Sequence, residues 1–341
     1  MEQSERLTPE SVVNDDWQAP PPPSTHKPTG KRKSSYLYGA IAVIVIGIAM
    51  LGLGFAKILP GIEGGGGMLA FFGVVLFALS FIPQPPESDG AQKTVNEIES
   101  LLTIFFSPTE VFRALRRSPR WIGALLVMTL VASAYQISFT ERLGAKRIVD
   151  YSISKLEASG FQLPPEAIEN SRRQQLNQLT NPAARSGTVV SNFASSFVGY
   201  AFLAAIYLLI VLAMGGSINF WQSLSTVIYA TFPVTIIRFV LNFVILFVKD
   251  PNDVHPIIGQ QSLVQDNLGA LVNPADSAVL WVILSAIGIL SFYWLWLTAT
   301  GLKNAGERVS PSTAWTGAII AWTGAVALGV VAALVFPSFF S

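Results

Sequence analysis

A polar stripe with one cation lies inside a long apolar stretch, residues 224–248. Its members, Thr231, Thr235, Arg238 and Asn242, follow one another at steps of four, three and four, so on a helix they share one face. A cation at bilayer depth is costly, and such a residue usually faces a protein interior or a wet cavity. The stripe therefore predicts either a site for an anionic lipid headgroup or solute, or a structural role in which Arg238 hydrogen-bonds neighbouring helices.

The sequence offers few other groups for catalysis. It has no cysteine and two histidines, which excludes thiol chemistry and a histidine-rich metal centre. Asp250, Asp253 and His255 are close in sequence, but Asn252 and the neighbouring prolines favour turn formation over metal binding. The sequence has no phosphate-binding loop or nucleophile elbow, and a net charge of +1 leaves no electrostatic footprint for nucleic acid. We expect no enzyme activity, cofactor, metal or nucleic-acid partner, and an intramembrane lipid enzyme ranks last.

The composition places the polar stripe in a membrane protein. Hydrophobic residues make up 51% of the chain and charged residues 13%, whereas soluble domains are about 25% charged. The apolar residues gather into about seven stretches near the roughly 20 residues that a spanning helix needs. These stretches are 36–59, 68–82, 121–139, 188–214, 224–248, 277–300 and 313–336. The predicted fold class is an all-α, polytopic transmembrane helical bundle.

The order of these stretches indicates four parts. Residues 1–35 are polar and Pro-rich and are expected to be a disordered tail. Residues 36–83 form a hairpin, because a short Gly- and Pro-rich turn joins the first two stretches, and 84–94 are a linker to a five-span domain at 95–337. Lys and Arg residues beside the first span favour an N-terminus on the inside. We expect an integral protein of the bacterial cytoplasmic membrane.

Two short amphipathic helices are predicted between the linker and the third span. In the first helix the apolar residues recur at helical spacing: Ile98, Leu101, Leu102 and Phe105. In the second, which Pro108 can begin and Ser107 can cap, apolar residues lie beside a basic face made of Arg113, Arg116 and Arg117. This pattern suits the headgroup region of a membrane, and an equal alternative is that both helices pack on the protein's own bundle.

The last span carries a ridge of small residues at every fourth position. The ridge consists of Gly317, Ala321, Ala325, Gly329 and Ala333. Small residues let another backbone approach closely, where packing supplies most of the association energy in lipid. Packing against another span of the same chain is the preferred interpretation, and a homo-oligomer is the alternative.

Several short motifs follow in order from residue 105 onward. They are FFSPTEVF at 105–112, Pro119 with Trp121, GG at 215–216, FW at 220–221, YA at 229–230 with Pro233, GL at 301–302, and Ser312, Ala314 and Trp322. Their order and spacing resemble the Yip1 domain family of five-span membrane proteins. The resemblance implies a helical bundle with a cytoplasmic N-terminus; eukaryotic relatives act in early secretory membranes and contact Rab-type GTPases and vesicle-coat factors. The Asp-Leu-Tyr-Gly-Pro run of the eukaryotic branch is missing and a hairpin is added, which suggests a prokaryotic-type member.

Two functional hypotheses follow. The leading one is a non-catalytic protein that organises membrane or recruits partners through residues 95–118 and the bundle interior around Arg238. Its partners would be the lipid bilayer, anionic headgroups and proteins at the cytoplasmic face. The alternative is a small transporter or channel that uses Arg238 to attract an anionic solute or lipid, although no inverted repeat is evident.

Overall fold

A computed structural model describes residues 34–84, 96–158 and 164–335. Within these residues every regular element is a helix, which confirms the all-α prediction for this part of the chain. The predicted tail lies outside the described residues except for its last two positions, and the predicted linker does so except for its first.

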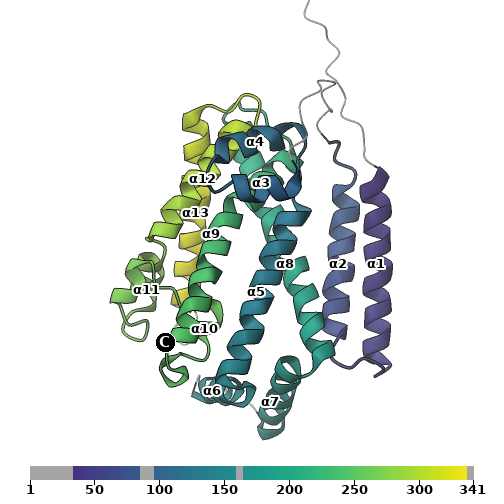
Figure 1. The fold of residues 1–341 in the computed structure, drawn as a ribbon, viewed down its shortest axis with the longest axis vertical. Helices are drawn as coiled ribbons and strands as arrows, with labels where there is room; N and C mark the ends of the chain where they lie inside the picture. The colour runs from purple at the N-terminus through teal and green to yellow at the C-terminus, as the bar shows by residue number, and fades with distance from the viewer. Residues whose placement is uncertain (1–33, 85–95, 159–163, 336–341) are drawn as a thin grey trace, which may run out of the picture.

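Five helices are long and apolar enough to cross a membrane. They are α1 (Ser34–Phe55), α5 (Ile122–Leu143), α8 (Pro182–Ala213), α9 (Phe220–Val248) and α13 (Pro311–Val335). They run roughly along one direction, as Figure 1 shows. Five of the seven predicted stretches therefore contain a helix that is long enough to cross a membrane. The second stretch forms α2 (Glu63–Leu79), an apolar helix of 17 residues.

The sixth predicted stretch, 277–300, does not form one continuous helix. The chain forms α11 (Ala278–Ser285) and α12 (Ile289–Ala305), separated by a break at 286–288. Asn267 and Gly288 form an antiparallel bridge, and Leu268 N–H donates to the Ile287 carbonyl at 3.0 Å. A Cβ at position 288 would lie 2.8 Å from the Asp266 carbonyl oxygen, so only glycine fits. The helix breaks because the segment around Asp266 occupies its path.

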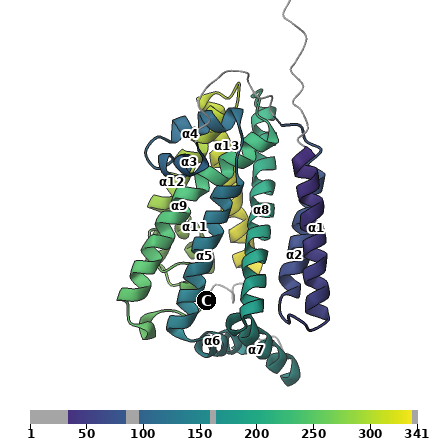
Figure 2. The same ribbon diagram turned by 45° about the vertical axis from the view of Figure 1, so that its right-hand side comes forward.

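Short helices cover the two ends of the bundle (Figures 1 and 2). α3 (Glu97–Thr103) and α4 (Pro108–Arg117) lie at the end where α1 begins. α6 (Ala145–Ala158) and α7 (Pro165–Thr180) lie at the opposite end. The loop after α9 contains η1 (Pro251–Asp253), α10 (Ile258–Gln261) and η2 (Leu268–Leu271). This loop packs on the bundle, since Tyr135 of α5 donates its hydroxyl hydrogen to the Gly259 carbonyl at 2.5 Å.

The N-terminal hairpin docks on the rest of the bundle through α2 and α8 (Figure 2). The contact is between backbones: a Cβ on Gly65 would lie 2.5 Å from the Gly187 carbonyl oxygen. Near the start of α1, the Tyr36 ring stacks on Trp221 with centroids 4.9 Å apart. Trp221 is itself 1% exposed and belongs to the central core, so the hairpin is joined to that core at one end and by backbone contact at the other.

Candidate functional site

The polar stripe of α9 faces α12 at its upper end. Thr231 donates its hydroxyl hydrogen to the Val227 carbonyl at 2.8 Å and accepts a hydrogen bond from the Trp294 indole N–H at 3.2 Å. Helices α9 and α12 are antiparallel neighbours, because Glu307 N–H after α12 donates to the Ser217 carbonyl before α9 at 2.8 Å. Thr231 therefore fixes the register between the two helices.

The lower end of the stripe holds the loop that follows α10. Asn242 is fully buried, and its side-chain oxygen accepts hydrogen bonds from the N–H groups of Leu263 at 2.8 Å and Val264 at 3.0 Å. Ser262 donates its hydroxyl hydrogen to the same oxygen at 3.3 Å. The amide nitrogen Nδ2 of Asn242 is buried and has no acceptor among the described residues. Asn242 thus satisfies backbone donors in a place that water reaches poorly.

Arg238 lies between these two contacts, about one turn before Asn242. Its Nε is buried and finds no hydrogen-bond acceptor within the described part of the chain. The sequences of α8, α9, α12 and α13 contain no acidic residue. Thr235, on the same face, is partly buried. The stripe therefore combines two residues engaged in packing, Thr231 and Asn242, with a cation whose Nε lacks a partner.

Asp266 is a carboxylate that the sequence did not place inside the bundle. Its carbonyl accepts from Ile289 N–H at 3.3 Å, and its side-chain Oδ2 accepts from Leu290 N–H at 3.0 Å. Arg238 lies about two turns beyond Thr231 along α9, and Ile289 lies between one and two turns before Trp294 along the antiparallel α12. Asp266 therefore caps the broken helix at about the height of Arg238, where its negative charge meets the positive end of the α12 dipole.

The basic face of α4 is held outward because the opposite face is sunk in the bundle. Val111, Phe112 and Leu115 are at most 3% exposed. Gly301 of α12 admits the Phe112 ring, since a Cβ there would lie 2.9 Å from a ring carbon. Of the basic residues, Arg113 and Arg117 are exposed and Arg116 is partly buried. Pro108 occupies the first turn as predicted, whereas the Ser107 side chain makes no capping bond.

α3 is anchored on the bundle by a carboxylate and by two apolar side chains. Glu97 accepts a hydrogen bond from Gly123 N–H in the first turn of α5 at 2.9 Å. Ile104 is fully buried, and the Phe105 ring packs edge-on against Phe232 with centroids 6.0 Å apart. The predicted stripe of the first helix is thus divided: Leu101 and Phe105 are partly buried, whereas Ile98 and Leu102 stay exposed.

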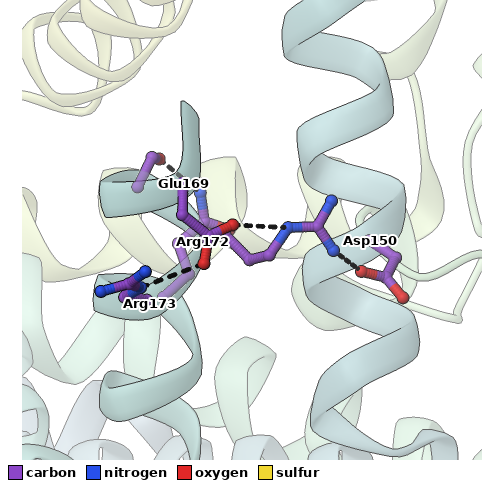
Figure 3. A network of polar contacts seen from close by, with 6 residues as sticks. Asp150, Glu169, Arg172 and Arg173 are labelled. Carbon is purple, nitrogen blue, oxygen red and sulfur yellow. Dashed lines mark hydrogen bonds and ion pairs between the residues drawn. The ribbon is translucent and has the colours of Figure 1, made fainter. Parts of the chain in front are cut away.

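The opposite end is a polar surface held by ion pairs (Figure 3). Arg172 of α7 pairs with Asp150 of α6, and Arg173 bonds Glu169 at 3.0 Å. Arg147 reaches from α6 to the η1 loop, where its guanidinium donates to the Pro251 carbonyl at 2.7 Å. Exposed pairs of this kind each stabilise little, so they orient the helices more than they stabilise the fold.

His255 caps a turn in the wall of an open cleft of about 930 Å³ beside α6. Its Nδ1 accepts hydrogen bonds from the N–H groups of Ile257 at 3.2 Å and Ile258 at 3.1 Å, and its Nε2 lies 2.9 Å from the Tyr151 hydroxyl. Burial lowers the pKa of His255, and the positive charge of Lys155 lowers it further. Asp250 Oδ1 accepts from Asn252 N–H at 2.8 Å, so it also serves as a turn cap.

Comparison with protein families identifies this arrangement. The model of the Yip1 domain matches residues 102–334, which is more than half of the chain. The chain belongs to the Yip1 domain family. This confirms the resemblance carried by the ordered motifs. No curated protein and no solved structure matches the chain significantly. With five apolar helices of spanning length, the protein is an integral membrane protein.

Within the Yip1 domain, neighbours in the same chain cover most of the small-residue ridge of α13. Gly317 lies close to Leu302 of α12, and a Cβ on Gly329 would lie 3.0 Å from Val282 of α11. Ala333 is 1% exposed and Ala321 packs against the central core. Ala325, in the middle of the ridge, is exposed.

Proposed function

We propose that this Yip1 domain protein organises the membrane and recruits anionic lipid, without catalytic activity, through the basic face of α4. The observation that carries the proposal is the burial of Val111, Phe112 and Leu115 in the bundle, which fixes the direction of the basic side chains. Arg113 and Arg117 are exposed on α4, which lies at the end of the molecule where α1 begins. Basic residues at this height attract anionic headgroups by roughly 1 kcal/mol each.

A non-catalytic role is supported by the use that the fold makes of its histidine. Within the described residues, His255 is the one histidine, and contacts engage both its ring nitrogens. A general base needs a ring nitrogen that is available to a substrate proton. The other polar contacts of this region cap turns or join helices.

The charge of α4 gives a direct test in phosphatidylcholine nanodiscs. We expect the variant Arg113→Glu/Arg116→Glu/Arg117→Glu to lose binding to vesicles that contain phosphatidylglycerol, as measured by co-flotation. A matched control reverses the same number of charges at the opposite end, at Lys146, Arg173 and Lys249, and should retain binding. Equal flotation of the α4 variant and the native protein would reject the assignment.

The proposal includes seven membrane crossings with the N-terminus inside the bacterial cytoplasmic membrane. α9 begins and α12 ends at the same end of the bundle, as the bond between Ser217 and Glu307 indicates. In this proposal the chain after α9 returns across the membrane, and α11 together with α12 is that crossing. Since the chain lacks cysteine, Glu110→Cys and Gln174→Cys can be labelled with an impermeant maleimide in spheroplasts. Labelling at position 174 and none at 110 is expected; the reverse pattern would refute the orientation.

A second candidate function is the movement of an anionic solute or lipid past Arg238. The specific observation in its favour is that Arg238 Nε and Asn242 Nδ2 are two buried donors about one turn apart, both without an acceptor among the described residues. The broken helix α11–α12 beside them resembles the discontinuous helices of transporters. Anion flux into proteoliposomes that is abolished by Arg238→Leu would favour this function over the first.

A further inference from the structure

α3 presents an apolar face that no part of the described bundle covers. Ile98 is 67% exposed, Leu102 64% and Phe106, just after the helix, 87%. The three residues are spaced by four, so they follow one side of the helix and its last turn. The inward side is occupied by the contacts of Glu97, Ile104 and Phe105 described above. The outward face is therefore fixed in place by the fold.

The position of this face suits the boundary between headgroups and acyl chains. α3 lies at the level of the first turn of α1, whereas α4 lies further from the centre of the bundle (Figures 1 and 2). Apolar surface that is left in water costs free energy in proportion to its area, and amphipathic helices recover it by lying about 5–10 Å into this boundary. Exposed arginines of α4 lie on the polar side, next to the headgroups.

The two helices that cover the opposite end, α6 and α7, have no comparable face. Among the described residues of α6 and α7, no large apolar side chain is exposed. The apolar residues of α6, Ile148, Val149 and Ile153, are buried at 4% exposure or less. Of these short helices at the two ends, α3 and α4 against α6 and α7, α3 thus alone presents large apolar side chains that are exposed.

We propose that α3 is a wedge that inserts Ile98, Leu102 and Phe106 into the leaflet on its own side, and that the protein accumulates where the membrane is convex toward that side. Convex curvature opens packing defects in the outer leaflet, and the wedge fills them. This inference deepens the proposed membrane-organising function, on which it rests, by naming the surface and the leaflet it enters.

Insertion can be measured in the full-length protein because it has no native cysteine. Single cysteines at positions 98, 102 and 106 carry an environment-sensitive NBD fluorophore in nanodiscs of phosphatidylcholine alone. We expect blue-shifted emission that is quenched by spin-labelled acyl chains, whereas Glu110→Cys on α4 should report water. Emission at position 106 equal to that at position 110 would overturn the proposal. The neutral lipid separates this result from the fate of the basic face.

Curvature preference is tested with membrane tubes pulled from giant phosphatidylcholine vesicles. Protein labelled at position 110 with an impermeant dye reports only molecules whose α3 end faces outward. We expect a tube-to-vesicle ratio above one for this protein and a ratio of one for Ile98→Ala/Leu102→Ala/Phe106→Ala. The control Leu130→Ala/Leu209→Ala/Phe202→Ala removes equivalent side chains from exposed positions within spans and should keep the native ratio. Identical ratios for the native protein and the α3 variant would overturn the wedge.

Failure of the two proposals can be told apart. If the arginine variant still floats with anionic vesicles while α3 inserts and the protein enriches in tubes, only the assignment of the basic face is rejected. If the protein binds anionic vesicles through α4 but the fluorophore at position 106 reports water, only the wedge proposal is rejected. Thermal unfolding of each variant shows whether the exposed substitutions leave the bundle intact.

Discussion

Trp294 donates its indole N–H to the hydroxyl of Thr231 across the interface of α9 and α12, at 3.2 Å. The Thr231 hydroxyl in turn donates its hydrogen to the Val227 carbonyl, one turn earlier in its own helix. A hydrogen bond between spans has few competitors in lipid, although its net contribution is modest. This pair sets the height of the broken helix relative to Arg238.

Thr231→Val should weaken this interface without changing the shape of the side chain. We expect the free energy of unfolding in detergent to fall by about 1 kcal/mol, the net value of one such bond. Trp294→Phe removes the same hydrogen bond and should also lower the free energy of unfolding. The double variant should lower it by less than the sum of the two single effects. Strict additivity in this double-mutant cycle would show that the bond contributes nothing.

Asn242 gives a sharper test because its side-chain oxygen accepts hydrogen bonds, whereas its side-chain nitrogen has no acceptor among the described residues. Asn242→Ala should destabilise the protein by about 2 kcal/mol, since it leaves the Leu263 N–H without an acceptor and the Val264 N–H with the Ser262 hydroxyl alone. Asn242→Asp keeps the acceptor and places a negative charge about one turn from Arg238, so we expect stability at least equal to that of the native protein. Denaturation monitored by tryptophan fluorescence would compare the variants. An aspartate variant as unstable as the alanine variant would contradict this account.

Gly288→Ala should disturb the break between α11 and α12. The new methyl group would overlap the Asp266 carbonyl at 2.8 Å, and overpacking of this kind costs about 2 kcal/mol. Gly324→Ala in α13 is the matched control, because a Cβ there meets nothing within 4 Å. The control should be neutral or slightly stabilising through helix propensity. Equal melting temperatures for both variants would argue against the bridge of Asn267 and Gly288.

The turn capped by His255 should open at mildly acidic pH. Because the folded protein lowers the pKa of His255 below its ordinary value of 6.5, its neutral form stabilises the turn fully above about pH 6.5. This contribution is lost as the pH falls below that value, when Nδ1 gains a proton and can no longer accept from Ile257 and Ile258. The protection factors for amide hydrogen exchange at residues 257–261, which are corrected for the intrinsic rate at each pH, should therefore fall from pH 7.5 to pH 5.

The chain has only two histidines, which makes the control simple. His26→Gln should retain the pH dependence of exchange at residues 257–261, and His255→Gln should remove it. The charged groups around the cleft are Lys146, Arg147, Asp150 and Asp253, and the positive charge of Lys155 acts on the ring. Protection factors that are equal at both pH values in the native protein would disprove the switch.

Much of the bundle could be predicted because lipid imposes a simple length rule on apolar helices. The stretches that became α5, α8, α9 and α13 have the required length, and the hairpin follows from a turn too short for any other arrangement. The rule did not predict the break within residues 277–300. Composition alone does not show that the segment around Asp266 meets the chain at Gly288. The glycine inside an apolar run was the available signal.

The candidate site was predictable in position but not in its partners. Helical spacing placed Thr231, Arg238 and Asn242 on one face, and that geometry is local. Asp266 was missed because it falls between the apolar stretches 224–248 and 277–300, and its height depends on how that segment folds back. α4 buries its apolar face, whereas α3 leaves Ile98 and Leu102 exposed. The burial of α4 depends on the space that Gly301 leaves for Phe112, which is a property of the assembled core.

The contact between Gly65 and Gly187 has a geometric consequence for the N-terminal extension. A side chain at position 65 would overlap the backbone of Gly187, so the close approach of the hairpin to α8 depends on this glycine. Together with the stacking of Tyr36 on Trp221, the contact holds the hairpin to the bundle near both of its ends. The start of α1 is thereby kept in place relative to Trp221 and the central core.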